Sequence, residues 1–352
     1  MPQEFHDAVF QLFQAMTITG ITPPNWLHSN TILLYKKNDL FDLTNYRPIA
    51  LAFALYKLWT SCLNILASDF VEAHKILSPE QEGFRSQRSC SRAITHLGLC
   101  IEDAHTHDKD VLLAYLDFTS AFPSADHTQL TRILHFLGIP EDFIIIVANL
   151  YSDAHTKFLT PYGWTRLVQI LRGTLQGDSL SPLIFDLMVE PLIRWIKSTQ
   201  KGYTLSSNNL SLSSKWYADD ATLLAPTIPA LEAQLQVVES FSKWSGIRLN
   251  IPKCRLTCYI HKLQSIKTKK NRDTALQTRL AHVRIGDTSI PILSQDDPLP
   301  GGYLGTALTT SLCPKAHLKW TLEVLTTISK AVLTTPLPPN IKQRLLLYGA
   351  NS

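Results

Sequence analysis

Three aspartates have the type and spacing that phosphoryl-transfer chemistry requires. Asp117 ends an unbroken apolar run that reads as a buried strand, and Asp219 and Asp220 stand side by side about one hundred residues later. Two adjacent carboxylates repel each other unless a cation lies between them and a third acid. Two Mg²⁺ ions about 3.5–4 Å apart, held by such hard oxygen ligands, can clamp the attacking and leaving oxygens of an in-line displacement. We therefore expect the three carboxylates to converge around one metal-sized gap.

Each part of this pattern has a simpler explanation when it is taken alone. An aspartate at the end of a strand often caps a turn, and a tight hairpin turn also favours Asp. A charged residue that closes a buried strand is nevertheless costly unless it is paired or bound to a metal. The order and spacing of the three acids along the chain favour the metal site.

The segments that must position these acids mix helices with short strands. Lys215–Tyr217 and Ala221–Ala225 flank the adjacent aspartates as two arms of a hairpin, and Val111–Leu116 is the strand before Asp117. Further strands are predicted at 31–35 and 168–171. Helices are predicted at 4–16, 50–74, 90–107, 231–244 (ending near Gly246), 316–333 and after Pro339. Another runs to Phe136, with Asp126 as its N-cap and Gly138 as its C-cap. A further helix runs to Lys197, with Ser181 as its N-cap and Pro182 at the first helical position. This mixture predicts an α+β fold rather than a doubly wound sheet.

The composition is that of a folded protein. Of the 352 residues, 45% are hydrophobic and 18% are charged, which excludes a chain that is disordered as a whole. The most apolar stretch, Ile49–Tyr56, is too short to cross a membrane, and no signal peptide follows Met1, so we expect a soluble, intracellular protein. The six cysteines are scattered, as in a protein with reduced thiols. Cys254, Cys258 and His261 have no nearby fourth ligand, so a structural zinc site is not predicted.

Positive charge is concentrated in one part of the chain. The formal net charge of +4 indicates little about partners, but residues 243–284 contain eleven Lys or Arg and a single acid, Asp273. A stripe of this kind suits a phosphate backbone, and a solvated surface segment is the alternative.

Several motifs follow one another in the order found in a known family. Tyr217-Ala218-Asp219-Asp220 resembles the signature box of reverse transcriptases. Further segments that are similar to motifs of that family are 45–49, 81–85, 117–122, 172–183, 246–253 and 303–305. Their combination points to the non-LTR (LINE-type) retrotransposon branch, and it covers nearly the whole chain. One departure is Pro123, where many relatives carry a second acid, and we expect it to alter local structure rather than catalysis.

The resemblance implies a fold and an activity. The fold is a right-hand polymerase of the α+β class, whose antiparallel palm sheet is flanked by helices. The subdomains implied are fingers at 1–110 and about 139–171, palm at 111–138 and 172–312, and a truncated thumb at 313–352. The activity is that of an RNA-directed DNA polymerase, a nucleotidyltransferase that adds dNTPs to the 3′-OH of a primer with two Mg²⁺ ions, or with Mn²⁺ in their place. The partners are an RNA template and a DNA primer, no membrane is involved, and the expected compartment is the nucleus. We expect the endonuclease and the complete thumb of a full element to be absent from this chain.

The resemblance also assigns roles to individual residues. Asp117 and Asp219 are the principal metal ligands, with Asp220 close by. Phe122 would lie under the sugar of the incoming nucleotide, where its ring excludes a 2′-hydroxyl and offers it no hydrogen bond. The nucleotide-binding residues implied are Lys36, Lys37 and Arg47 at the triphosphate, together with Phe122, Gln176 and Gly177, and the template or primer contacts are Arg85, Tyr217, Tyr303, Leu304 and Gly305.

Three alternatives to this function remain open. An RNA-dependent RNA polymerase has the same palm, but Phe122 argues against it, because such enzymes usually need a group that accepts the ribose hydroxyl at that position. A catalytically silent scaffold that binds RNA is the second, and the retained aspartates argue against it. The third is a fragment of a retroelement that does not fold alone.

Overall fold

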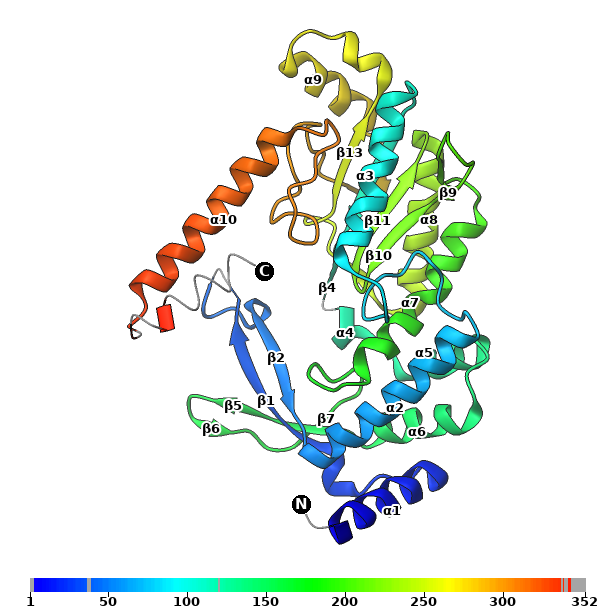
Figure 1. The fold of residues 1–352 in the computed structure, drawn as a ribbon, viewed down its shortest axis with the longest axis vertical. Helices are drawn as coiled ribbons and strands as arrows, with labels where there is room; N and C mark the ends of the chain where they lie inside the picture. Colours follow the sequence, from blue (N-terminus) through cyan, green and yellow to red (C-terminus); the bar gives the residue numbers. More distant parts are fainter. Residues whose placement is uncertain (1–2, 37–38, 120, 337, 339–340, 343–352) are drawn as a thin grey trace.

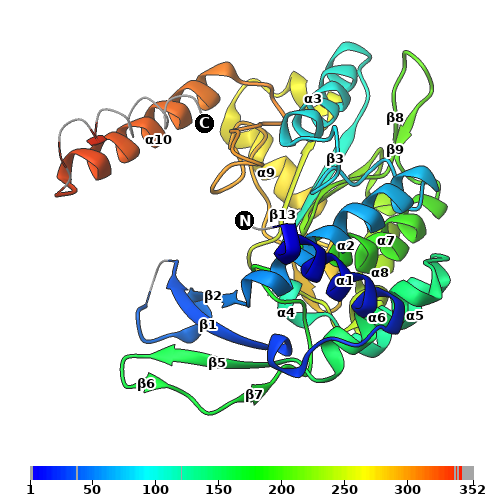
Figure 2. The ribbon, with the colours of Figure 1, turned by 60° about the horizontal axis from the view of Figure 1, so that its bottom comes forward.

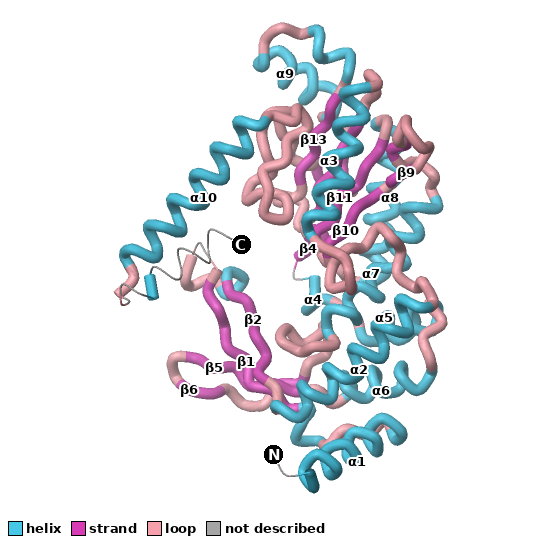
Figure 3. The backbone as a smooth tube through the Cα atoms, viewed as in Figure 1, coloured by secondary structure: helices cyan, strands magenta, loops and turns pink. Residues whose placement is uncertain are grey.

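The structure is a computed structural model that describes residues 3–36, 39–119, 121–336, 338 and 341–342. It contains a sheet built around the buried strand that precedes Asp117, and a second sheet formed by segments from the first half of the chain. Most of the helices lie around the central sheet, whereas the second sheet extends away to one side (Figure 3). The expectation of an α+β fold is confirmed.

The central sheet has four antiparallel strands in the order β10-β11-β3-β13. Their bounds are β10 Ser214–Tyr217, β11 Asp220–Ala225, β3 Val111–Leu116 and β13 Arg255–Tyr259. Every residue of β3 is buried, because the strand lies inside the sheet and both faces of the sheet are covered. This burial explains why the segment is apolar at every position rather than at alternate ones.

Helices cover both faces of the central sheet (Figure 1). Successive side chains of a strand point to opposite faces. Leu113 of β3 packs in one core cluster with Leu97 of α3 (Cys90–Thr106). Ala114 packs in the other cluster with residues of α7 (Ser181–Ser198) and α8 (Ile228–Ser245). The sequence expectation placed the segment of α3 in the fingers, whereas its buried side packs against the central sheet.

The second sheet lies beside the central sheet rather than continuing it (Figure 2). In it β1 pairs antiparallel with β2 and parallel with β5, and β6 and β7 pair with β5. The bounds are β1 His28–Tyr35, β2 Tyr46–Leu51, β5 His155–Thr160, β6 Gly163–Trp164 and β7 Val168–Gln169. A backbone hydrogen bond of 2.8 Å from Ala50 N to Gln176 O links β2 to the loop before α7.

The remaining elements complete the framework. The α-helices are α1 Gln3–Thr19, α2 Ala54–Ala73, α4 Ala121–Ser124, α5 His127–Phe136, α6 Glu141–Ser152, α9 Lys269–Leu280 and α10 Pro314–Thr334, which projects away from the central sheet (Figure 1). The 3-10 helices are η1 Pro24–Leu27, η2 Leu43–Asn45 and η3 His261–Ser265. The short strands are β4 Phe118–Thr119, β8 Tyr203–Thr204, β9 Ser211–Leu212, β12 Arg248–Leu249, β14 Arg284–Ile285 and β15 Thr288–Ser289. Within the described part of the chain, no helix is long and apolar enough to cross a membrane.

Several boundaries differ from the sequence prediction. The single helix predicted at 50–74 is wrong at its start, because residues up to Leu51 belong to β2 and α2 begins only at Ala54. The sequence prediction missed α6 and β5 entirely. The strand predicted at 168–171 is shorter, because only Val168 and Gln169 pair with β5. Of the helix predicted after Pro339, only Ile341 and Lys342 are described, and both are helical.

The predicted helix caps are partly confirmed. The side chain of Asp126 accepts hydrogen bonds from the backbone N–H groups of Thr128 and Gln129, as an N-cap should. Ser181 is not an N-cap, since Leu180 occupies that position and makes no side-chain capping bond. Gly138 follows Leu137, the C-cap residue of α5, and has a φ of +74°.

Candidate active site

The adjacent aspartates lie at a tight turn between β10 and β11. Tyr217 is paired with Asp220, so the turn itself consists of Ala218 and Asp219. Ala218 has a φ of +54°, in the left-handed region that residues other than glycine seldom adopt. The favoured two-residue hairpin turns have a positive φ at their first residue, which is Ala218 here. The conformation of Ala218 therefore determines how the side chain of Asp219 is presented.

Asp117 reaches the same edge of the central sheet from the neighbouring strand. Leu116 lies opposite Ala221 in the pairing of β3 with β11, so Asp117 follows β3 at the position next to Asp220. Burial and then the like charge of Asp117 raise the pKa of Asp219. Asp220 is an exposed residue, and desolvation of its carboxyl group together with the charges of Asp219 and Asp117 raises its pKa to about 6. The three carboxylates therefore repel one another through space.

The expectation that all three carboxylates surround one metal-sized gap is wrong for this arrangement. Among the residues that the structure describes, no three His, Cys, Asp or Glu side chains are close enough together to hold one ion. Side chains alternate between the two faces of a strand. Asp220 is on the same face of β11 as Leu224, which packs in one core cluster with Tyr303. Ala221 is on the opposite face and packs in the other core cluster. Asp219, by contrast, belongs to the turn before β11.

Cations face the aspartates from two directions. The ammonium group of Lys253 lies 3.9 Å from the carboxylate of Asp117. The backbone carbonyl of Asp117 accepts a 2.8 Å hydrogen bond from Asn250 N. Lys36, at the end of β1, comes from the second sheet. Burial and the neighbouring charges of Arg47 and Lys253 lower the pKa of Lys36, and the charges of Asp117 and Asp219 act in the opposite direction. Acids of the central sheet and cations of the second sheet therefore share one electrostatic environment.

Arg47 and Lys37 are the other two residues that we expected to bind the triphosphate. Arg47 is exposed on β2, opposite Leu34 of β1, and its charge acts on both Lys36 and Asp219. Lys37 lies outside the described residues. The structure thus brings Lys36 and Arg47 to the aspartates.

Phe122 is half-buried in α4, and its ring stacks on Phe185 of α7 with centroids 4.3 Å apart. The carbonyl of Phe122 accepts a 2.9 Å hydrogen bond from Thr174 N, which ties α4 to the loop before α7. A Cβ on Gly173 would lie 2.4 Å from Pro123 Cα, so this loop passes directly over Pro123. Pro123 is therefore a packing surface for the loop.

Gln176 and Gly177 make a contact that the sequence did not predict. Gly177 has a φ of +112°, and a Cβ there would lie 2.7 Å from the carbonyl oxygen of Ala50. The missing side chain thus allows the loop to approach β2, whereas we had expected it to allow the approach of a nucleotide. Gln176 is half-buried.

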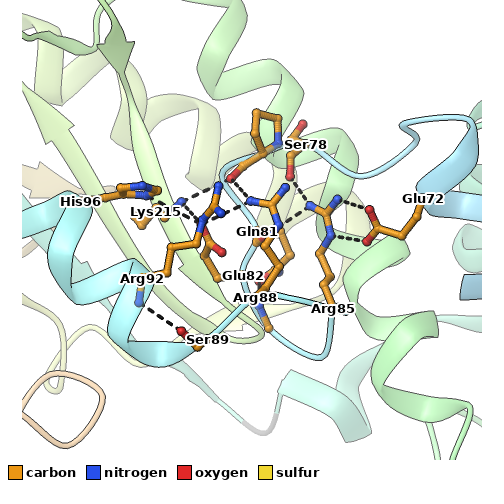
Figure 4. A network of polar contacts seen from close by, with 12 residues as sticks. Glu72, Ser78, Gln81, Glu82, Arg85, Arg88, Ser89, Arg92, His96 and Lys215 are labelled. Carbon is orange, nitrogen blue, oxygen red and sulfur yellow. Dashed lines mark hydrogen bonds and ion pairs between the residues drawn. The ribbon is translucent and has the colours of Figure 1, made fainter.

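Arg85 does not have the geometry expected of a template contact. Its side chain is 5% exposed, and its guanidinium donates to both carboxylate oxygens of Glu72 and to the carbonyls of Ser78 and Gln81 (Figure 4). A guanidinium buried with its donors used in this way stabilises the surrounding loop. The expectation that Arg85 contacts template is corrected accordingly.

Tyr303 is also buried, so its ring does not face a primer. The ring packs on Tyr115 with centroids 5.6 Å apart. The following turn is tight: Tyr303 and Thr306 exchange two backbone hydrogen bonds, and Leu304 and Gly305 have φ values of +48° and +82°. Leu304 and the exposed Gly305 are the parts of this motif that reach the surface. Tyr217, which precedes the aspartate turn, is half-buried.

Comparison with known proteins decides the family. The family model described as "Reverse transcriptase (RNA-dependent DNA polymerase)" matches residues 35–308, which is more than half of the chain. The chain belongs to the reverse transcriptase family. The predicted resemblance to its non-LTR branch is also confirmed.

The relatives of this reverse transcriptase domain include the Pol polyproteins of R2 retrotransposable elements. The type-2 element R2DM of Drosophila melanogaster is 28% identical over 83% of this chain and 26% of its own length. The type-1 element R2 of Popillia japonica is 27% identical over 96% of this chain and 46% of its own length. The chain thus spans about a quarter to about half the length of these relatives. Among solved structures, an apo telomerase of Candida tropicalis, truncated from its C-terminal domain, matches with a TM-score of 0.48 at 12% identity, covering 72% of this chain and 55% of the other.

Reverse transcriptases generally use divalent metal ions. The donor chemistry at this edge of the sheet fits such an ion, because carboxylate oxygens are hard ligands and a cation between Asp117 and Asp219 would relieve the repulsion that raises the pKa of Asp219. The ligand type and the negative charge at this end of the sheet therefore fit a divalent cation.

Two residues beside Asp117 were not predicted from the sequence. Lys253 and Asn250 lie in the segment that resembles a later palm motif, but no role was predicted for either. Their place becomes apparent only when β12, directly before Asn250, pairs with β4, directly after Asp117. The only indication in the sequence was that both residues lie in the segment 246–253, which resembles a palm motif of the family.

Proposed function

We propose that this chain is the RNA-directed DNA polymerase of a non-LTR retrotransposon and adds dNTPs to the 3′-OH of a primer. The observation that carries the proposal is that Asp117, Asp219 and Asp220 lie at one end of the central sheet, where their charges act on one another and on Lys36 and Arg47 of the second sheet. Acids that bind metal and cations that bind phosphate are the two parts that phosphoryl transfer requires.

Asp117 and Asp219 would hold the metal, and Asp220 lies close by. We propose two Mg²⁺ ions, for which Mn²⁺ could substitute. When bound, such ions stabilise the charge that develops on the attacking and leaving oxygens. Lys253 and Asn250 hold Asp117 at the end of β3.

Lys36 and Arg47 would bind the triphosphate of the incoming nucleotide as fixed positive charges, with Lys37 as a third candidate. Phe122 would exclude a 2′-hydroxyl, and its stacking on Phe185 holds the ring in one orientation for that task. Gln176 and Gly177 would border the nucleotide through the loop that contacts β2.

The partners would be an RNA template and a DNA primer. Tyr217 would contact the primer end beside the aspartate turn, and the exposed turn at Leu304 and Gly305 would hold the primer backbone. The subdomains would be fingers at 1–110 and about 139–171, palm at 111–138 and 172–312, and the start of a thumb from 313. The expected compartment is the nucleus, where a retrotransposon meets its target DNA.

A primer-extension assay tests the proposal. An oligo(dT) primer annealed to poly(rA) is incubated with the protein, dTTP and Mg²⁺, and a parallel gel-shift assay measures binding of the same duplex. We expect extension that depends on both template and metal. Binding without extension would contradict the proposal and favour the RNA-binding scaffold.

A further inference from the structure

A short segment before α3 lies along the edge of the central sheet, directly behind the aspartate turn. Gln81 forms a parallel bridge with Trp216 of β10, Trp216 N donates to the carbonyl of Glu80 at 3.0 Å, and Glu82 N donates to the carbonyl of Trp216 at 2.9 Å. The segment thus adds a short backbone pairing to β10, two residues before the turn.

The side chain of Gln81 reaches from this segment to the strained residue of the turn. Its Oε1 accepts a 2.9 Å hydrogen bond from Ala218 N and a 3.0 Å bond from Gly83 N, and its Nε2 donates to the carbonyl of Ala218 at 3.4 Å. Gln81 is 0% exposed. One buried amide therefore binds both backbone polar groups of Ala218, the residue whose φ is +54°.

The backbone beside Gln81 is in equally close contact with the turn. A Cβ on Gly83 would lie 2.3 Å from Ala218 N, so only glycine allows this approach. The left-handed conformation is unfavourable for alanine and persists only where the surroundings impose it. Gln81 and Gly83 are those surroundings.

Ion pairs on both sides fix the segment in place (Figure 4). The buried carboxylate of Glu82 is bound by Lys215 of β10 and lies 3.2 Å from Arg92 of α3. On the other side, the buried guanidinium of Arg85 binds Glu72 of α2 at 2.7 Å. The residues that follow Gln81 are therefore tied to β10, α3 and α2, which fixes the backbone from which the Gln81 side chain reaches Ala218.

We infer that Gln81 is a positioning residue for catalysis: it holds Ala218 in the left-handed conformation and thereby sets the direction of the Asp219 carboxylate. This inference rests on the proposed polymerase function. A displacement of a reacting group by about 1 Å can cost about a hundredfold in rate. Gln81 should therefore affect the turnover number much more than substrate binding.

The test compares two buried glutamines that bind backbone groups. Gln81→Met removes the bonds to Ala218, and Gln234→Met, the matched control, removes the bonds that Gln234 makes to the carbonyls of Lys201 and Leu224. Both should lower the melting temperature. Only Gln81→Met should lower kcat, by about tenfold to a hundredfold, with KM for dTTP changed less than threefold. Gln81→Glu, whose buried carboxyl keeps an acceptor for Ala218 N, should retain more of kcat than Gln81→Met.

Rescue by glycine separates positioning from general stability. Glycine adopts positive φ without strain, so Ala218→Gly should restore at least a third of the kcat lost in Gln81→Met. If the wild type does not extend a primer, the proposed function fails and the inference falls with it. If the wild type extends, equal kcat losses in Gln81→Met and Gln234→Met, or no rescue by Ala218→Gly, overturn the inference alone. Loss of folding by Gln81→Met both with and without Ala218→Gly would also overturn it, because Gln81 would then serve the fold.

Discussion

Lys253 lies with its ammonium group 3.9 Å from the carboxylate of Asp117, although β10, β11 and two long helices separate the two residues in sequence. The contact depends on the pairing of β12 with β4, which brings the residues after Leu249 back to the end of β3. Burial raises the pKa of Asp117, and the charge of Lys253 is the first of the influences that lower it again. Lys253 thus favours the ionised form of a proposed metal ligand.

Replacing Lys253 by Met should shift the acid limb of the kcat–pH profile to higher pH. Removal of the cation raises the pKa of Asp117 further, and the protonated form of Asp117 cannot bind a metal. The pair is partly exposed, so the shift should shrink at high salt. The control is Lys243→Met, which removes a pair with Glu239 away from the site. An unchanged acid limb in Lys253→Met would show that the ion pair does not act on the metal ligand.

Asp220→Asn should stabilise the metal-free protein above pH 6 and leave it unchanged near pH 3.5. The pKa of Asp220 is raised from 3.8 to about 6 in the fold, so the folded chain holds a proton that the unfolded chain has already released. Stability therefore falls as pH rises from about 4 to about 6, because Asp220 becomes charged beside Asp219 and Asp117. Asparagine removes this loss.

Thermal unfolding in EDTA at several pH values measures the effect. Asp287→Asn is the matched control, because Asp287 is exposed in the two-residue turn between β14 and β15. A melting-temperature difference between Asp220→Asn and wild type that is the same at pH 4 and pH 7.5 would contradict the assignment of repulsion to Asp220.

Phe122→Val should raise the incorporation of UTP relative to dTTP by about tenfold or more. The aromatic ring would exclude a 2′-hydroxyl and leave it without hydrogen bonds, a loss that costs about 1–3 kcal/mol. Valine opens that space, and dTTP use should fall modestly. Because Phe122 also stacks on Phe185, some thermal stability should be lost.

Competition between dTTP and UTP on one primer-template measures this discrimination. Phe13→Val, at a half-buried phenylalanine of α1 that packs on the same core cluster, should lose stability without a change in sugar choice. Equal use of dTTP and UTP by the wild type would favour the RNA-polymerase alternative.

Local patterns predicted much of the central sheet. The apolar run Val111–Leu116 matches β3 because burial on both faces demands apolar residues at every position. Asp126 capped α5 as predicted, since its side chain competes well for helix N–H groups. The second sheet was harder to predict. The segment Tyr46–Leu51 becomes a strand through its pairing with β1 and its contact with the loop at Gln176, which are long-range contacts that a local pattern does not contain.

The motifs predicted where the candidate site lies, but they did not predict the role of each residue within them. Arg85 and Tyr303 lie in family-like motifs, yet both are buried and serve the framework. Gln81 was quoted only as a member of its motif, whereas its amide binds the aspartate turn. A motif records that residues are needed together, and only the packing distinguishes the residues that face a substrate from those that hold them.

Asp219→Asn in the primer-extension assay tests the central claim most directly. Metal ligation supplies several kcal/mol of transition-state stabilisation, so we expect the rate on poly(rA)–oligo(dT) to fall about a thousandfold or more, with an unchanged or slightly higher melting temperature. The control is Asp287→Asn, the same substitution in the second position of another two-residue hairpin turn, after Gly286 with a φ of +56°. It should leave the rate unchanged. An Asp219→Asn protein that retains more than about a tenth of the wild-type rate would contradict the account.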